Sequence, residues 1–210
     1  MNLIFMGPQG SGKGTQGKIV AERLGFAHIS TGDLLRGAEG DLKKEIDSYI
    51  NEGNLAPDEL ILRILQERIK KDDCSKGFIL DGYPRNLQQA QDLKEVVDVD
   101  FVVEITLGEK ESIKRLSGRC FCEKCGKSYN SVIDVFKPKI EGICDDCGGK
   151  FIQRADDYPE AIKKRLEIYR NGTGPILDFY EKDNTAKVFK IDGEQSVETV
   201  TEDLFGTLKY

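Results

Sequence analysis

Short apolar runs alternate with longer amphipathic stretches along the chain. Runs typical of buried β-strands occupy residues 3–6, 27–29, 78–81, 101–105 and 187–191. Residues 16–24 are expected to form a helix that ends at Gly25, because glycine readily adopts the left-handed conformation of a C-cap. The repeated order of strand and helix predicts an α/β fold with a mostly parallel, helix-covered sheet.

A second amphipathic helix is predicted to begin at Pro57, Asp58 and Glu59, which are typical of a first helical turn. Apolar residues then recur at spacings of three and four, at Leu60, Ile61, Ile64, Leu65 and Ile69. This spacing places them on one face of the helix, which is expected to pack into the core.

A glycine-rich segment, residues 7–15, lies between the first apolar run and the first predicted helix. Gly7, Gly12 and Lys13 satisfy the pattern Gly-x4-Gly-Lys of phosphate-binding loops, in which backbone N–H groups and the lysine converge on an anion. The next residue is Gly14, so the hydroxyl usually found beside the metal comes one position late, at Thr15. An ordinary glycine-rich turn is the alternative, but strand, loop and helix follow in the order that a nucleotide site requires.

Two more polar segments follow predicted strands. Ser30 and Asp33 have the spacing of a helix capping box, and residues 81–85 come after the run at 78–81. Ligands bind at the carboxyl ends of parallel strands, so residues 7–15, 30–33 and 81–85 are expected to converge on one cleft.

Composition and charge limit the class of partner. The 210 residues are 39% hydrophobic and 32% charged, with a net charge of -6, which argues against nonspecific binding to nucleic acid or a membrane surface. No apolar run approaches the ~18 residues of a membrane span. The short apolar start before Gly7 lacks the basic flank of a secretion signal, so a cytoplasmic enzyme is predicted.

Two Cys-x2-Cys pairs have the spacing of a zinc site. Cys122 and Cys125 are separated from Cys144 and Cys147 by 18 residues. Tetrahedral coordination by four thiolates fits this pattern, whereas disulfides are rare in a reducing cytosol. The remaining cysteines, and His28 as the single histidine of the chain, are not assigned to the metal.

Several separated motifs together resemble the adenylate kinase family, in its long-lid, zinc-binding bacterial form. They are residues 7–15, 30–33 with Arg36, 80–85, 117–119, and 153–157 with Arg165. The resemblance implies transfer of the γ-phosphoryl group of Mg·ATP to AMP, giving two ADP. It also implies a monomer with a five-stranded parallel sheet, helices on both faces, an AMP-binding arm and a zinc-stapled lid.

The resemblance implies a role for each motif residue. ATP would be bound by Gly10, Ser11, Gly12, Lys13, Gly14, Thr15, Arg115, Arg119 and Gln195. AMP would be bound by Thr31, Arg36, Gly82, Arg85, Gln89, Arg154 and Arg165, with residues 53–58 near its base. The catalytic set would be Lys13, Arg119, Arg154, Arg165, Asp81, Asp156 and Asp157, where Asp81 would hold water on Mg²⁺ and Asp156 and Asp157 would tie the lid to the site.

The resemblance divides the chain into core segments at residues 1–29, 59–119 and 158–210, an arm at 30–58 and a lid at 120–157. Structural alternatives remain for single residues: Arg115 and Arg165 could pair with Glu111 and Glu167, and Asp156 or Asp157 could cap the helix that Pro159 begins.

Other functions also remain open. Another nucleoside monophosphate kinase, or one using GTP as donor, would share nearly every motif. A zinc-ribbon ATPase that binds nucleic acid is the alternative outside the kinases, but it would need a basic surface that the composition does not indicate.

Overall fold

A computed structural model describes residues 1–50, 54, 56–154 and 156–209, without the side chains of residues 41, 42, 45 and 50. Its main sheet has five parallel strands in the order β2-β3-β1-β4-β8. The strands are β1 (Asn2–Met6), β2 (Ala27–Ser30), β3 (Phe78–Asp81), β4 (Phe101–Thr106) and β8 (Lys187–Asp192). All five predicted strands are confirmed.

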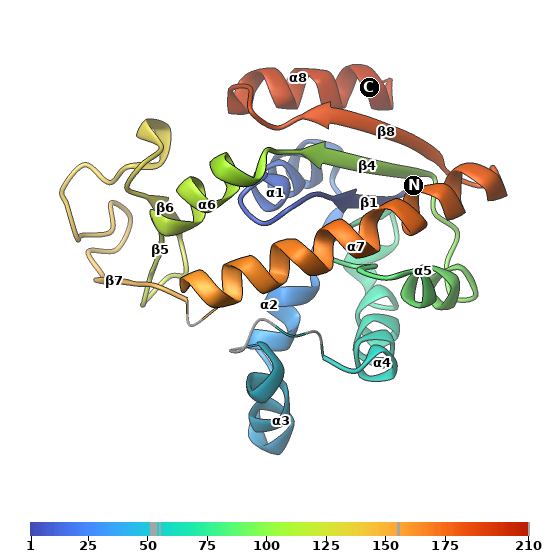
Figure 1. The fold of residues 1–210 in the computed structure, drawn as a ribbon, viewed down its shortest axis with the longest axis horizontal. Helices are drawn as coiled ribbons and strands as arrows, with labels where there is room; N and C mark the ends of the chain where they lie inside the picture. Colours follow the sequence, from blue (N-terminus) through green and yellow to red (C-terminus); the bar gives the residue numbers. More distant parts are fainter. Residues whose placement is uncertain (51–53, 55, 155, 210) are drawn as a thin grey trace.

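Helices cover both faces of this sheet (Figure 1). The flanking helices of the core are α1 (Lys13–Leu24), α4 (Asp58–Ile69), α5 (Leu87–Lys94), α6 (Glu109–Ser117), α7 (Pro159–Asp183) and α8 (Val197–Leu208). Leu3 and Phe5 of β1 pack with α1 and α8, whereas Ile4 packs with α4, α5 and α7. Successive side chains of a strand point to opposite faces, so β1 contributes to both cores. This arrangement confirms the predicted fold class.

Local signals set the helix boundaries. Gly25 has the left-handed φ of 68° that the sequence predicted for a C-cap, while α1 begins at Lys13, three residues before the predicted start. Ser30 accepts a hydrogen bond from the Asp33 backbone and so caps α2 (Thr31–Arg36). In α4, Leu60, Ile61 and Leu65 are buried, as their spacing predicted.

Two smaller units extend from the core. Figure 1 shows α3 (Gly40–Ile50) projecting on one side, beyond α2, and a small sheet at one end of the molecule. This second sheet is antiparallel, with β5 (Arg119–Cys122) between β6 (Ser128–Asn130) and β7 (Phe151–Ile152). Single turns of 3-10 helix occupy Asp72–Cys74 and Asp134–Phe136. Among the described residues, no helix is long and apolar enough to cross a membrane.

Helix α7 approaches the core closely at one glycine. A Cβ atom at Gly172 would lie 2.2 Å from the backbone oxygen of Arg85, so only glycine allows this separation. The contact holds α7 against the segment that follows β3. Arg165, two turns earlier on α7, is thereby placed near the same end of the sheet.

Candidate active site and metal centre

One cleft of about 580 Å³ lies at the carboxyl ends of the central strands. Strand register explains its position, because Phe5 pairs with Asp81 and Asp81 pairs with Ser30. The segments that follow these strands, residues 7–15, 30–33 and 81–85, contribute to its walls. The predicted convergence of three loops is confirmed.

The glycine-rich loop has the backbone geometry of an anion cradle. Gly12 has a φ of 88°, which an L side chain rarely adopts, and it immediately precedes the first turn of α1. A Cβ atom at Gly14 would lie 3.1 Å from Asp81 Oδ2. This close approach gives a physical reason for glycine where related loops carry a hydroxyl, and Thr15 lines the cleft one position later.

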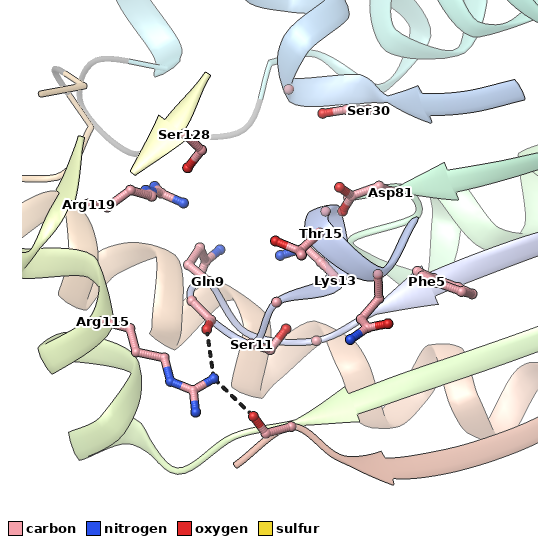
Figure 2. A pocket seen from close by; sticks show the side chains of 18 of the residues that line it. Phe5, Gln9, Ser11, Lys13, Thr15, Ser30, Asp81, Arg115, Arg119 and Ser128 are labelled. Carbon is pink, nitrogen blue, oxygen red and sulfur yellow. Dashed lines mark hydrogen bonds between the residues drawn. The ribbon is translucent and has the colours of Figure 1, made fainter. Parts of the chain in front are cut away.

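Lys13 lies inside the cleft among other charged groups. Figure 2 shows Lys13, Thr15 and Asp81 gathered on one side, with Arg115 and Arg119 facing them. Burial lowers the pKa of Lys13 to about 8; Asp81 raises it, whereas Arg85, Arg165 and Arg119 lower it further. A bound polyanion would offset the repulsion between Lys13 and these arginines, so the cleft favours the binding of negative charge.

Arg85 is held in place by neighbouring residues of the cleft. Its Nε donates to the Gly82 oxygen at 2.7 Å, and its backbone N–H donates to Gln89 Oε1 at 2.7 Å. Burial, and next the charge of Arg165, lowers the pKa of Arg85 to about 10. Gln89 Nε2 also donates to Asp58 at 2.6 Å, so this amide positions Arg85 as well as lining the cleft.

Other residues predicted to bind AMP lie in the same part of the cleft. Thr31 Oγ1 donates to the backbone oxygen of Asp81 at 3.2 Å, and Gly82 and Arg36 line the cleft. Of residues 53–58, predicted to lie near the acceptor base, residues 53 and 55 are outside the described part of the chain. Asn54 and Ala56 line the cleft.

Asp33 connects α2 to the segment that follows β7 of the small sheet. Its Oδ1 accepts from Arg36 at 2.6 Å and lies 3.4 Å from Arg154. Burial would raise the pKa of Asp33, but the hydrogen bond from Arg36 lowers it. Burial, and then the charges of Arg36 and Arg119, lowers the pKa of Arg154 to about 10. These guanidinium groups form a cluster of like charge.

Asp157 joins Arg119 of β5 to Arg165 of α7. Arg119 Nε donates to Asp157 Oδ2 at 2.8 Å, and Arg165 lies 3.2 Å from Asp157 Oδ1 and 3.0 Å from Asp156 Oδ2. The Asp157 side chain is fully buried and does not line the cleft, whereas Asp156, Arg119 and Arg165 do. Tyr158 is the N-cap of α7, so neither aspartate caps that helix, and Arg165 pairs with both aspartates.

Arg115 makes the ion pair with Glu111 that was considered for it and also contacts two backbone segments at the cleft. It pairs with Glu111 at 3.0 Å, and its guanidinium also donates to the backbone oxygens of Gly193 at 2.9 Å and Gly10 at 3.4 Å (Figure 2). Arg115 therefore braces the phosphate loop against the segment after β8. Gln195 lines the same side of the cleft and donates to Asp203 at 3.0 Å.

Asp81 has oxygen chemistry suited to magnesium. Its carboxylate is buried; burial would raise its pKa, but His28 and Lys13 lower it, so the anion is favoured. His28 Nε2 lies 3.5 Å from Asp81 Oδ2. Carboxylate and hydroxyl oxygens, here of Asp81 and Thr15, are the ligand type that Mg²⁺ prefers, directly or through water. These residues fit an ion bound with a nucleotide.

The four predicted thiolates meet at the tip of the small sheet. Their sulfur atoms all lie within 4.8 Å of one another; Cys122 and Cys147 are 3.3 Å apart, and Cys125 and Cys144 are 3.6 Å apart. Tetrahedral zinc with bonds of about 2.3 Å places sulfurs roughly 3.8 Å apart. The donor set and its spacing therefore fit one thiophilic ion.

Tyr129 supports this cluster through its hydroxyl group. The hydroxyl oxygen accepts from the Asp145 backbone at 2.8 Å, which leaves its single proton for Cys144 Sγ at 3.4 Å. The pKa of Cys144 is lowered to about 6, chiefly by this hydrogen bond. The thiolate is the form that binds metal. Cys120 packs beside the cluster, and Cys74 is a buried thiol next to Arg68.

Two residues near the cations had no role assigned from the sequence. Asp33 was predicted in a helix capping box and within the cleft-lining segment 30–33, without a role of its own, and Phe121 was not singled out. The ring of Phe121 lies under Arg154, with 4.0 Å between Cζ and the ring centroid, and lines the cleft. The position of Phe121 two residues after Arg119 in a strand was the available signal.

Known proteins resemble this chain along its whole length. A model of the adenylate kinase family matches residues 5–185. An adenylate kinase of Fervidobacterium nodosum is 45% identical, covering 99% of this chain and 97% of that protein. Adenylate kinases of Treponema denticola and Methanocella arvoryzae are 46% and 42% identical, covering 95% and 100% of this chain and 95% and 99% of those proteins. Together with the five-stranded sheet and its cleft, these matches show that the chain belongs to the adenylate kinase family.

Proposed function

We propose that this protein reversibly transfers the γ-phosphoryl group of ATP to AMP, giving two ADP. The observation that carries the proposal is a convergence of cations on one cleft in a chain with a net charge of -6. The cations that line the cleft include Lys13, Arg36, Arg85, Arg119, Arg154 and Arg165, together with Arg115 and Lys18. Such a cluster is costly without a polyanion, and two nucleotides held end to end would supply one.

The donor nucleotide is assigned to the phosphate loop. The backbone of residues 10–15 and the Lys13 ammonium would hold its phosphates at the N-terminus of α1. Arg115 and Gln195 would flank its base. Arg119 would contact the transferring group after exchanging part of its bond with Asp157 for phosphate oxygens.

The acceptor nucleotide is assigned to the opposite side. Arg36 and Arg85 would hold the AMP phosphate, with Arg154 and Arg165 between the two nucleotides. Thr31, Gly82 and Gln89 would lie along AMP. Since the attacking phosphate oxygen is already anionic, the reaction needs alignment and charge neutralisation, and no general base.

Magnesium would enter with ATP and be held through water by Asp81, near Thr15. When bound, the ion neutralises charge on the outer phosphates. Asp81 is well placed for this role because its anionic form is favoured. Asp156 and Asp157 would keep Arg119 and Arg165 in register while the substrates bind.

Zinc at Cys122, Cys125, Cys144 and Cys147 would be structural, because four thiolates leave no open coordination position. The ion would staple the lid, residues 120–157. The arm, residues 30–58, and the lid would close over a core of residues 1–29, 59–119 and 158–210. We place this enzyme in the cytoplasm as a monomer that binds neither nucleic acid nor membranes.

The direct test is ADP formation from ATP plus AMP, with each substrate also omitted in turn. A panel of GTP and of CMP, UMP and GMP at matched concentrations separates this activity from other monophosphate kinases and from a GTP-dependent one. ADP formation that needs AMP is expected. Equal activity with every acceptor would contradict the assignment to AMP.

A further inference from the structure

We propose that Phe121 is a positioning residue for phosphoryl transfer, whose ring holds Arg154 and Arg119 beside the cleft. The ring centroid is 4.0 Å from Arg154 Cζ and 5.7 Å from Arg119 Cζ. Both distances are within the ~6 Å range of cation–π attraction. This inference rests on the proposed function, in which both arginines contact the transferring group.

The position of Phe121 follows from strand β5. Successive side chains of a strand alternate between faces, so Arg119 and Phe121 share one face while Cys120 and Cys122 share the other. Arg119 and Phe121 line the cleft, and Cys120 and Cys122 pack in the metal cluster. Strand β5 thus contributes to the cysteine cluster with one face and to the cleft with the other.

Arg154 reaches the ring from the neighbouring strand. Phe121 pairs with Ile152 of β7, and Arg154 follows two residues later. Pairing of β5 with β7 therefore brings the ring and the guanidinium group together although 33 positions separate them in the sequence.

The ring contacts Arg154 in a way that its carboxylate neighbours do not. Burial, and then the charges of Arg36 and Arg119, lower the pKa of Arg154, whereas Asp33, 3.4 Å away, and Asp156 raise it. A carboxylate takes up N–H groups that should bind phosphate. A ring contacts the flat face of guanidinium and leaves its in-plane N–H donors free for bidentate binding.

The first experiment compares Phe121→Leu, which keeps apolar volume but removes the π face, with Phe121→Trp, which retains it. Cation–π attraction of about 0.5–2 kcal/mol corresponds to a loss of roughly 2- to 30-fold in kcat/KM for Phe121→Leu. Phe121→Trp should retain most of the activity. Wild-type kcat/KM in Phe121→Leu would overturn the proposal.

A second experiment separates the π face from shape. Site-specific replacement of Phe121 by mono-, di- and trifluorophenylalanine weakens the ring quadrupole stepwise at nearly constant size. We expect kcat/KM to fall with each fluorine. The matched control is the same series at Phe151, whose ring contacts Tyr129 in the same sheet. No trend at Phe121, or an equal trend at Phe151, would overturn the proposal.

A binding measurement keeps this test independent of the proposed reaction. Calorimetric titration with inorganic tripolyphosphate should show weaker binding to Phe121→Leu than to wild type, with unchanged zinc content and melting temperature in the variant. Equal binding would contradict the role of Phe121. A wild-type protein that forms no ADP would instead contradict the proposed function.

Discussion

At the scale of single residues, Lys13 occupies surroundings that disfavour its charge. Its pKa is about 8 against an ordinary 10.5, chiefly because of burial. Between those two pH values Lys13 is therefore mostly deprotonated in the folded protein and still protonated in the unfolded chain. Lys13 costs folding stability below pH 8, and the cost diminishes as the pH rises from 8 toward 10.5.

The lowered pKa of Lys13 has the opposite effect on catalysis, which should weaken in the pH range in which folding stability rises. Loss of the Lys13 charge weakens phosphate binding, so we expect kcat/KM for ATP to fall above a pH of about 8. A pH profile at low ATP concentration measures this. In Lys13→Arg the cation stays charged, so its alkaline limb should move above pH 10 even though its absolute rate is lower. An unchanged limb in that variant would assign the ionisation to another group.

The arginines should divide their roles between substrates. Arg85→Ala is expected chiefly to raise KM for AMP, whereas Arg119→Ala should chiefly lower kcat, each by about 10²-fold or more in kcat/KM. Steady-state kinetics with both substrates varied separates the effects. Arg170→Ala is the matched control, because Arg170 is exposed and pairs with Glu109. Wild-type KM and kcat in Arg85→Ala would remove Arg85 from the acceptor site.

At the scale of elements, α7 carries a position that only glycine fills. Gly172→Ala would place a methyl group against the Arg85 oxygen, and such overpacking costs about 1–3 kcal/mol, or several degrees in melting temperature. KM for AMP should also rise because Arg85 moves. Gly174→Ala is the control on the same helix: a Cβ atom there meets open space, so stability should stay equal or increase. Equal melting temperatures of the two variants would show that α7 does not press on Arg85.

The small sheet is an element that its metal should stabilise. We expect about one Zn²⁺ per chain, and we expect chelation or Cys144→Ser to loosen residues 120–157 while the parallel sheet stays folded. Elemental analysis and hydrogen exchange measure these effects. Cys120→Ser is the control, because Cys120 lies outside the four-sulfur cluster. Full stability and activity after complete zinc removal would refute a structural role.

At the scale of the whole molecule, the site draws on three separate parts of the chain. Asp33 and Arg36 lie on α2, Lys13 and Arg165 lie on α1 and α7, and Arg154 follows β7 of the small sheet. Because these parts must come together to surround the phosphates, a single substrate should not assemble the complete site. Closure over both substrates would also exclude water.

ATP hydrolysis without AMP should therefore be very slow compared with transfer to AMP. Phosphate release from ATP alone, measured beside ADP formation with both nucleotides, tests this expectation. Addition of AMP should increase ADP formation without increasing free phosphate. Steady phosphate release at a rate close to that of transfer would contradict the kinase assignment.

The sequence by itself determined features that depend on local chemistry. Strand and helix periods identified all five core strands and the buried face of α4, and glycine spacing located the phosphate loop around Lys13. The spacing of Cys122, Cys125, Cys144 and Cys147 identified the four-sulfur cluster. Each of these signals is contained within a few turns of chain, or within a motif that tolerates little variation.

Only the tertiary structure decided which partners the charged residues take. Asp157 binds Arg119 across 38 positions of sequence, and Arg154 stacks on Phe121 because β5 pairs with β7. A linear pattern can show that such residues are present, but it contains neither the strand pairing nor the side-chain directions that bring them together. The demand for glycine at position 172 also arises from packing, since a helix shows no local need for it. Contacts between segments that are distant in the sequence depend on how the whole chain folds.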